Sequence, residues 1–219
     1  MVRLLRDNSG SVLVPYTLVF PLFLVATLGT VDMAFMLYEW ALANKAAYVG
    51  ARRAVVSSPV AEAITNPPYT QSQLQQLGLP CSDVASGQRN VLSDGQPVCP
   101  ALASVCTPTR TGGNCTNGFR WDETAFATIF GAMQNVFPRL ERENVLISYQ
   151  TNNQGFVGQP GGLPMNVTVS IRCMTHELYF IDALLGWTFS PPSGCPATLQ
   201  GPSIPSFAST LQSEDMATN

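Results

Sequence analysis

An uncharged apolar run near the N-terminus constrains this chain more than any other feature of its sequence. No charged side chain occurs between Asp7 and Asp32. About 20 consecutive apolar residues are enough for a helix to cross the hydrocarbon core of a bilayer. The run therefore predicts a membrane-spanning helix close to the start of the chain.

The helical pattern continues beyond the apolar run. Residues 32–56 are rich in Ala, Leu and Met, which favour helix. Pro59 ends the pattern, because proline disfavours helix in the residue before it. A helix over 11–57 extends about 70 Å at about 1.5 Å per residue, much more than a bilayer core requires. Spacings of three and four residues predict one packed face, formed by Leu37, Ala41, Asn44, Tyr48, Ala51 and Val55.

The remainder of the chain, residues 58–219, is predicted to form one modest globular domain. Asp122 and Glu123 suit the N-terminus of a helix, and an apolar stripe follows from Phe126 to Phe137. Alternating apolar residues over 144–151 and 166–173 predict two half-buried strands joined by a glycine-rich loop. A small antiparallel sheet packed on the long N-terminal helix follows, which is an α+β fold.

The 6 cysteines all lie beyond the apolar run. An even count confined to one side of a membrane anchor indicates disulfides formed in an oxidising compartment; reduced, buried cysteines are the alternative. Residues 81–118 have the composition of an irregular insertion that needs such bonds. We expect Cys173 to pair with Cys195 and the other four to pair locally, namely Cys81, Cys99, Cys106 and Cys115.

Charge is sparse, and its placement limits orientation and partners. The net charge of −3, without a basic cluster, gives no footprint for nucleic acid. Arg3 and Arg6 precede the span, whereas Asp32 and Glu39 are the first charges after it, which favours a cytoplasmic N-terminus. The cysteines indicate the same orientation, so we expect a single span with the C-terminal domain outside. Asp32 and the later arginines are expected to be solvated, with Asp32 the better candidate for a role.

No pattern of catalytic or ligand-binding residues stands out. His176 is the only histidine, and we expect it on the surface or in a loop because no nucleophile motif lies near it. One histidine among scattered cysteines, without a Cys-x-x-Cys pair, does not favour zinc. We therefore expect no enzyme, no cofactor and no metal site.

Small residues stand before the apolar run, not after it. A secretory signal peptide carries its cleavage site after an apolar core of about 7–15 residues. Here Asn8, Ser9, Gly10 and Ser11 precede a longer run. Cleavage between Gly10 and Ser11 would leave the apolar helix on the mature protein as a retained anchor. An uncleaved signal anchor is the alternative.

This arrangement resembles the leader of type IV pilins and pseudopilins, which a prepilin peptidase cuts after a glycine. The first 56 residues more closely resemble the TadE family of minor pseudopilins from tight-adherence (Flp-type) pilus systems. Gly10, the apolar stretch with its internal Pro21, the acidic Asp32 and the Ala-Arg-rich helix up to Arg52 carry the resemblance. A weaker echo lies over 204–211.

The resemblance implies a structural role in pilus assembly, either at the tip or in initiation. It implies the following partners: a prepilin peptidase, other minor pilins, the inner-membrane pilus assembly platform and membrane lipid. Residues 1–10 would be a cytoplasmic leader, 11–57 the pilin-like helix and 58–219 a periplasmic domain with its Cys-rich insertion. A signal-anchored, single-pass periplasmic binding module or enzyme unrelated to pili is the alternative.

Pro15 departs from the family pattern. Pilin-like sequences carry Glu five residues after the cut, followed by an aromatic residue, whereas this chain has Pro15 and Tyr16. In the pilin model that carboxylate pairs with the amine of a neighbouring subunit, since an unpaired charge inside a bilayer is costly. Three explanations stay open. Either assembly depends on packing and tolerates the change, or the subunit sits at the filament tip, as does the tip pseudopilin of type II secretion systems, which also lacks this Glu. In the third explanation the leader is never cut. Pro21 predicts a kink in the span, and we group Pro15, Tyr16, Pro21 and Asp32 as assembly residues.

Overall fold

A computed structural model describes residues 13–66, 68–82, 88–176, 178–180, 190, 193, 195, 201–213 and 216. The prediction of a cleavage site between Gly10 and Ser11 lies outside the described residues. The chain divides into two compact units. The first comprises Met1–Trp40 with Thr175–Ile204, and the second comprises Ala41–Met174 with Pro205–Asn219.

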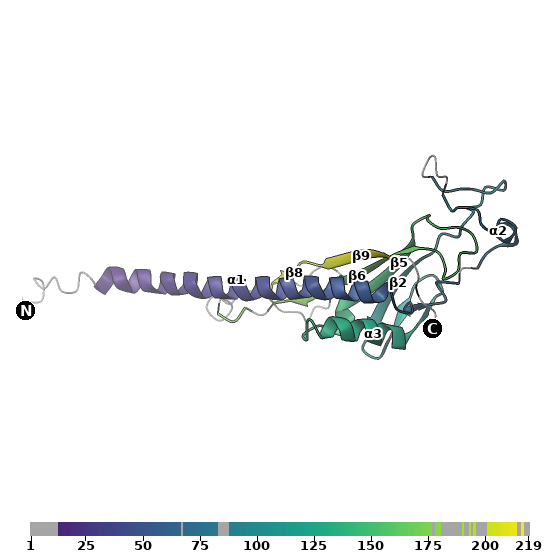
Figure 1. Cartoon of the computed structure of the whole chain (residues 1–219). Coiled ribbons are helices and arrows are strands. Elements are labelled where there is room, and N and C mark those ends of the chain that lie inside the picture. The colour runs from purple at the N-terminus through teal and green to yellow at the C-terminus, as the bar shows by residue number, and fades with distance from the viewer. Residues whose placement is uncertain are drawn as a thin grey trace, which may run out of the picture. The chain divides into compact units, whose positions relative to one another are not determined.

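One long helix, α1 (Leu13–Ala54), contributes to both units (Figure 1). It ends at Ala54, earlier than the predicted Ser57, in a turn closed by a hydrogen bond from the Val55 N–H to the Ala51 carbonyl. Pro21 lies inside the helix without ending it, and a kink there stays a prediction. The predicted long N-terminal helix is therefore present.

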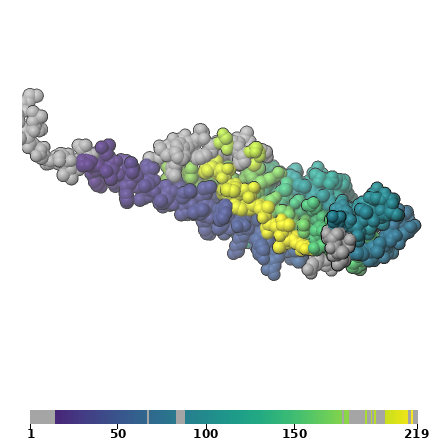
Figure 2. Space-filling view, turned by 90° about the horizontal axis from the view of Figure 1, so that it is seen from above, coloured from purple at the N-terminus to yellow at the C-terminus, as the bar shows by residue number. Residues whose placement is uncertain are grey.

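The second unit is built on a five-stranded antiparallel sheet in the order β3-β2-β5-β6-β9. The predicted hairpin is paired along its full length, from Val145 opposite Ile171 to Thr151 opposite Met165. β9 is an edge strand and lies at the surface (Figure 2, yellow). The predicted α+β class is confirmed. The strands are β2 (Ala103–Thr109), β3 (Gly112–Cys115), β5 (Val145–Thr151), β6 (Met165–Ile171) and β9 (Phe207–Ser213).

Three strands of this sheet were not predicted. β2 and β3 occupy part of 81–118, which we expected to be irregular because Pro, Gly, Ser and Thr dominate it. Residues such as Pro and Gly disfavour strands, but Cys106 lies opposite Cys115 in the β2–β3 pair and the two are joined by a disulfide. β9 takes its place through pairing with β6, a long-range contact that its own sequence does not reveal.

The helix α3 (Glu123–Gln134) and the second half of α1 lie on the sheet (Figure 1). Asp122 caps α3 as predicted, because its Oδ1 accepts the N–H groups of Thr124 and Ala125 at 2.8 and 3.1 Å. A Cβ on Gly50 would lie 2.5 Å from Met133 Sδ and 3.2 Å from Val169 Cγ1. The two helices and β6 therefore meet at Gly50. The predicted stripe is mostly buried: Phe126, Ile129, Met133 and Phe137 are buried and Phe130 is half-buried.

The packed face of α1 in this unit differs from the predicted one. Ala41, Asn44 and Tyr48 of the predicted face are exposed, and Ala51 is its only fully buried member. The prediction followed spacing and included larger side chains. The structure selects the smallest residues instead, because the sheet and α3 approach the helix closely. These residues are Ala43, Ala46, Ala47, Gly50, Ala51 and Ala54.

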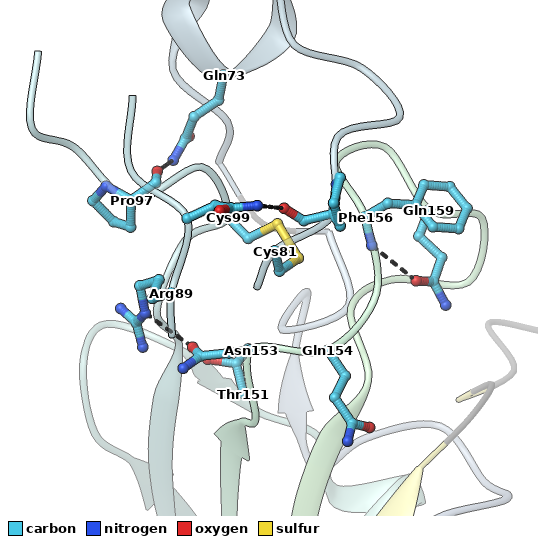
Figure 3. The surroundings of a disulfide bond; sticks show 12 residues. Gln73, Cys81, Arg89, Pro97, Cys99, Thr151, Asn153, Gln154, Phe156 and Gln159 are labelled. Carbon is cyan, nitrogen blue, oxygen red and sulfur yellow. Dashed lines mark hydrogen bonds between the residues drawn. A yellow bond between two sulfur atoms is a disulfide. The ribbon is translucent and has the colours of Figure 1, made fainter. Parts of the chain in front are cut away.

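Disulfides hold the loops of the second unit. Cys81 is bonded to Cys99 and Cys106 to Cys115, while Cys173 and Cys195 are also disulfide-bonded, so no cysteine is free. The Cys81–Cys99 bond lies beside the β5–β6 loop (Figure 3), where the Cys81 N–H donates to the Gly155 carbonyl at 2.9 Å. This disulfide packs with Val98, Val157 and Leu163 in a small apolar cluster.

The remaining elements are short. β1 (Ala61–Glu62) pairs with β4 (Arg120–Trp121), and β7 (Met174–Thr175) forms a two-stranded sheet with β8 (Ser203–Ile204). The helix α2 (Gln71–Leu74) begins with a capping box between Thr70 and Gln73. A 3₁₀ turn (Arg142–Asn144) leads into β5.

Candidate functional site

The first half of α1 presents an apolar surface that is largely exposed. Its large side chains are exposed, with Leu18 and Leu22 each at 72%. The helix has a mean hydropathy of 1.9 in its most apolar stretch and is long enough to cross a membrane. A continuous surface of this kind is unfavourable in water, whereas it matches the environment of lipid chains. The helix fits a membrane anchor.

The hydroxyl groups of Thr27 and Thr30 in this part of α1 are bonded inside the helix. The Thr27 hydroxyl donates to the carbonyls of Phe23 and Leu24, each at 3.0 Å, and the Thr30 hydroxyl donates to the Thr27 carbonyl at 2.7 Å. Because lipid supplies no hydrogen-bond partners, a spanning helix must satisfy its polar groups internally. The two threonines meet that requirement.

The residues grouped for assembly do not gather at one place. Pro15, Tyr16 and Pro21 lie on the exposed surface of α1, where the rings of Tyr16 and Phe20 stack with centroids 5.4 Å apart. Asp32 lies about 25 Å farther along the helix than Pro15, at about 1.5 Å per residue. Asp32 therefore belongs to a different site, at the C-terminal end of the uncharged apolar stretch.

Asp32 is fully buried, which corrects the prediction of a solvated charge. Its Oδ2 accepts the backbone N–H of Phe180 at 3.0 Å. A span of about 20 residues that starts near Pro15 ends close to this position. A carboxylate at such a depth is costly unless it is bonded, so the contact with Phe180 stabilises it there.

His176 is also buried, not on the surface as expected. Its Nδ1 lies 2.7 Å from Glu39 Oε2, with the two side chains 1% and 14% exposed. The His176 N–H donates to the Pro202 carbonyl at 3.0 Å, and its Nε2 has no hydrogen-bond partner among the described residues. No sequence pattern signals the pair, because 137 positions separate the two residues.

A short segment therefore covers one face of α1, and we call the residues 175–176 and 178–180 the strap. Asp32, Phe35 and Glu39 share a helical face through their spacing of three and four residues. The strap contacts all three: Phe180 bonds Asp32, the Tyr179 ring meets Phe35 edge-on at 6.4 Å, and His176 pairs with Glu39. Two acidic residues that follow the uncharged apolar stretch are thus shielded by one segment from far along the chain.

This arrangement places Asp32 and Glu39 of α1 against the strap. Within the part of the chain that the structure describes, no group of three or more His, Cys, Asp or Glu side chains is placed to hold a metal ion. His176 and Glu39 face each other in a buried contact, and the rings beside them come from Tyr179 and Phe35. The site therefore serves to pack a strap against a helix.

Comparison with known proteins finds a family match for the N-terminal part of the chain. Residues 10–52 match the model of the TadE-like protein family, the family that the sequence resemblance indicated. The match includes the span, Asp32 and Glu39, and it ends within the second half of α1. This family suggests a role in tight-adherence pilus systems. No curated protein and no solved structure matches the chain.

Proposed function

We propose that the chain is a structural minor pseudopilin of a bacterial tight-adherence pilus. One observation carries the proposal: the residues that match the TadE-like family are those of a helix that is exposed and apolar in its first half and packed on a sheet in its second. A single continuous helix then serves both as membrane anchor and as the core of the outer domain. The protein lies in the inner membrane with its C-terminal domain in the periplasm.

Disulfides support the proposed orientation. No cysteine is free, and two of the bonds join residues of the second unit. Disulfides form and persist in the bacterial periplasm and are rare in the cytosol. A cytoplasmic N-terminus and a periplasmic C-terminal domain satisfy this constraint.

Processing and partners follow from the same proposal. A prepilin peptidase cuts after Gly10, and Ser11 becomes the new N-terminus of a retained anchor. The exposed apolar surface of α1 then contacts membrane lipid, other minor pilins and the inner-membrane assembly platform. Residues 1–10 stay in the cytoplasm.

Pro15 supports a place at the tip or in initiation of the filament. Within the exposed first half of α1, no charged side chain lies between Pro15 and Asp32, and the Asp32 carboxylate is bonded by the strap. The span therefore offers no carboxylate for the amine of a subunit added beyond it. A subunit at the tip needs no such pairing.

Mass spectrometry of the full-length protein extracted from membranes tests the proposal. An N-terminus at Ser11 is expected, and Gly10→Val is expected to accumulate with residues 1–10 attached. Retention of the leader in the unaltered protein would contradict processing and would favour the alternative of a signal-anchored periplasmic binding module or enzyme.

The tip position has a separate test. Pro15→Glu restores a carboxylate at the fifth position after the cut, and we expect it to change pilus number or the location of the subunit. Val14→Glu is the matched control, because it places the same charge one residue away. Equal behaviour of Pro15→Glu and the unaltered protein would count against the tip position.

A further inference from the structure

We propose that Leu178–Phe180 of the strap lie in the outer interfacial region of the bilayer. The protein then contacts lipid through two segments that are distant in sequence, and not through α1 alone. The inference rests on the proposed membrane anchor, and the partner is the headgroup and upper acyl-chain region of the same membrane.

The position of the strap along the axis of α1 is the first observation that supports this placement. Asp32 and Glu39 lie about 25 and 36 Å from Pro15 along the helix axis, at about 1.5 Å per residue. The hydrocarbon core is about 30 Å thick, so its outer boundary falls between these two residues. Because Phe180 bonds Asp32 and Tyr179 meets Phe35, the strap lies at that boundary.

The exposed side chains at this level have the chemistry of a membrane interface. Tyr179 and Phe180 of the strap are 57% and 38% exposed. On α1, three aromatic residues just beyond Asp32 are exposed, namely Phe35, Tyr38 and Trp40, and exposed Met33 and Leu37 lie among them. Tyrosine and tryptophan concentrate at membrane–water interfaces, where their rings sit among the headgroups. The five rings together form an aromatic belt drawn from two segments.

Two polar groups of the strap are bonded to α1. The Phe180 N–H is bonded by Asp32, and the buried His176 side chain is bonded by Glu39. An unsatisfied polar group is costly where water is scarce. Since none of the described strap residues exposes a charge, the segment meets the requirement for resting against lipid.

Tryptophan fluorescence in the full-length protein tests the proposal. Tyr179→Trp is placed in a Trp40→Phe, Trp187→Phe background and reconstituted in phosphatidylcholine vesicles whose lipids are brominated near the headgroup end of the acyl chains. Trp121 stays in every variant, and the emission of the background protein is subtracted. Bromine quenches on contact, so we expect the indole at 179 to lose most of its emission.

Two further variants make the outcome specific. Phe156→Trp is the matched control, because Phe156 is exposed in the β5–β6 loop of the second unit, and its emission should be retained. Phe23→Trp reports on the anchor itself and should be quenched by lipids brominated at mid-chain. Quenching at 23 but not at 179 overturns the strap proposal and leaves the anchor standing, whereas quenching at neither position overturns both.

A protein occupant gives a different result. The emission of the indole at 179 can also be insensitive to brominated lipid and yet become protected from quenching by aqueous iodide as the protein concentration rises. In that case a neighbouring subunit covers the strap, and the proposal is wrong. Phe180→Trp serves as the second probe if Tyr179→Trp fails to fold, as judged by its circular dichroism and intact disulfides. The expected result at 180 is the same loss of emission.

Discussion

The two halves of α1 are both helical, but they differ in which side chains are exposed and which are buried. In the first half the large residues are outside, with Leu18 and Leu22 mostly exposed. In the second half the small residues are inside, and Ala43, Ala46 and Ala47 are completely buried. A helix in water buries its large apolar residues, so the exposed apolar surface of the first half fits a membrane anchor.

The contrast reflects what each half requires of its surroundings. The first half needs only lipid, and its surface is apolar without a preferred face. The second half needs close approach, because a sheet and α3 can pack near the helix axis only where side chains are small. The change occurs between Asp32 and Glu39, where the strap covers the first charges after the span.

Placing an arginine in each half of α1 in turn should give the largest difference in effect between the two halves. Leu22→Arg is expected to reduce membrane integration by about 2.5–3.5 kcal/mol, the cost of an arginine at the centre of a spanning helix. The fraction resistant to alkaline extraction of membranes measures this. Asn44→Arg, at an exposed site of the second half, should integrate normally. Equal integration of both variants would remove the distinction between the halves.

Adding a leucine to each half tests the close packing. Gly50→Leu places a side chain where even a Cβ would lie 2.7 Å from Met133 Cγ, and we expect a loss of about 1–3 kcal/mol in the free energy of unfolding, as for overpacked cores. Urea unfolding in detergent, followed by circular dichroism, measures it. Ala26→Leu, at an exposed position of the first half, should leave the midpoint unchanged. A stable Gly50→Leu variant would show that the contact with α3 is loose.

A buried hydrogen bond ties the segment after α1 to the sheet. The Tyr149 hydroxyl accepts the Val60 N–H at 3.0 Å, and burial raises the pKa of Tyr149, so the phenol stays neutral at physiological pH. Tyr149→Phe leaves that N–H without its partner, and we expect a loss of about 1–3 kcal/mol. Unfolding of Tyr48→Phe, which alters an exposed tyrosine of α1, is the control. A loss no greater than that of the control would mean that the N–H finds another acceptor.

The parts of the fold that the sequence predicted are those set by local patterns. The span follows from an uncharged run, the cap of α3 from Asp122, and the β5–β6 hairpin from alternating residues over 144–151 and 166–173. Each of these signals lies within a few residues of the structure it specifies. Local sequence patterns were therefore sufficient to predict the α+β fold class.

The parts that the sequence did not predict depend on distant partners. Asp32 and His176 look like ordinary surface residues until the strap brings Phe180 and Glu39 to them. β9 resembles a polar loop in sequence and becomes a strand only beside β6. The buried face of α1 also depends on its neighbours, since spacing alone fits several faces of a helix rich in alanine.

The smallest expected effect is the pH dependence of an ion pair in the second unit. Arg142 donates to both carboxylate oxygens of Glu123 at 2.6 and 2.8 Å and lies over the Phe126 ring. The hydrogen bonds from Arg142 lower the pKa of Glu123. A lowered pKa in the folded state stabilises the protein above the ordinary pKa of glutamate, and that contribution is lost as the pH falls through the lower value.

Because both side chains are partly exposed, we expect the pair to contribute about 0.2–1 kcal/mol. Glu123→Gln should therefore unfold more readily than the unaltered protein at pH 7, and the two should converge as the pH falls below the ordinary pKa of glutamate, about 4.3. Glu62→Gln is the matched control, since the Glu62–Arg120 pair is longer, at 3.5 Å, and more exposed. If the difference between Glu123→Gln and the unaltered protein persists unchanged in acid, then packing of the Arg142 guanidinium on the Phe126 ring, and not the charge of Glu123, stabilises this edge of the domain.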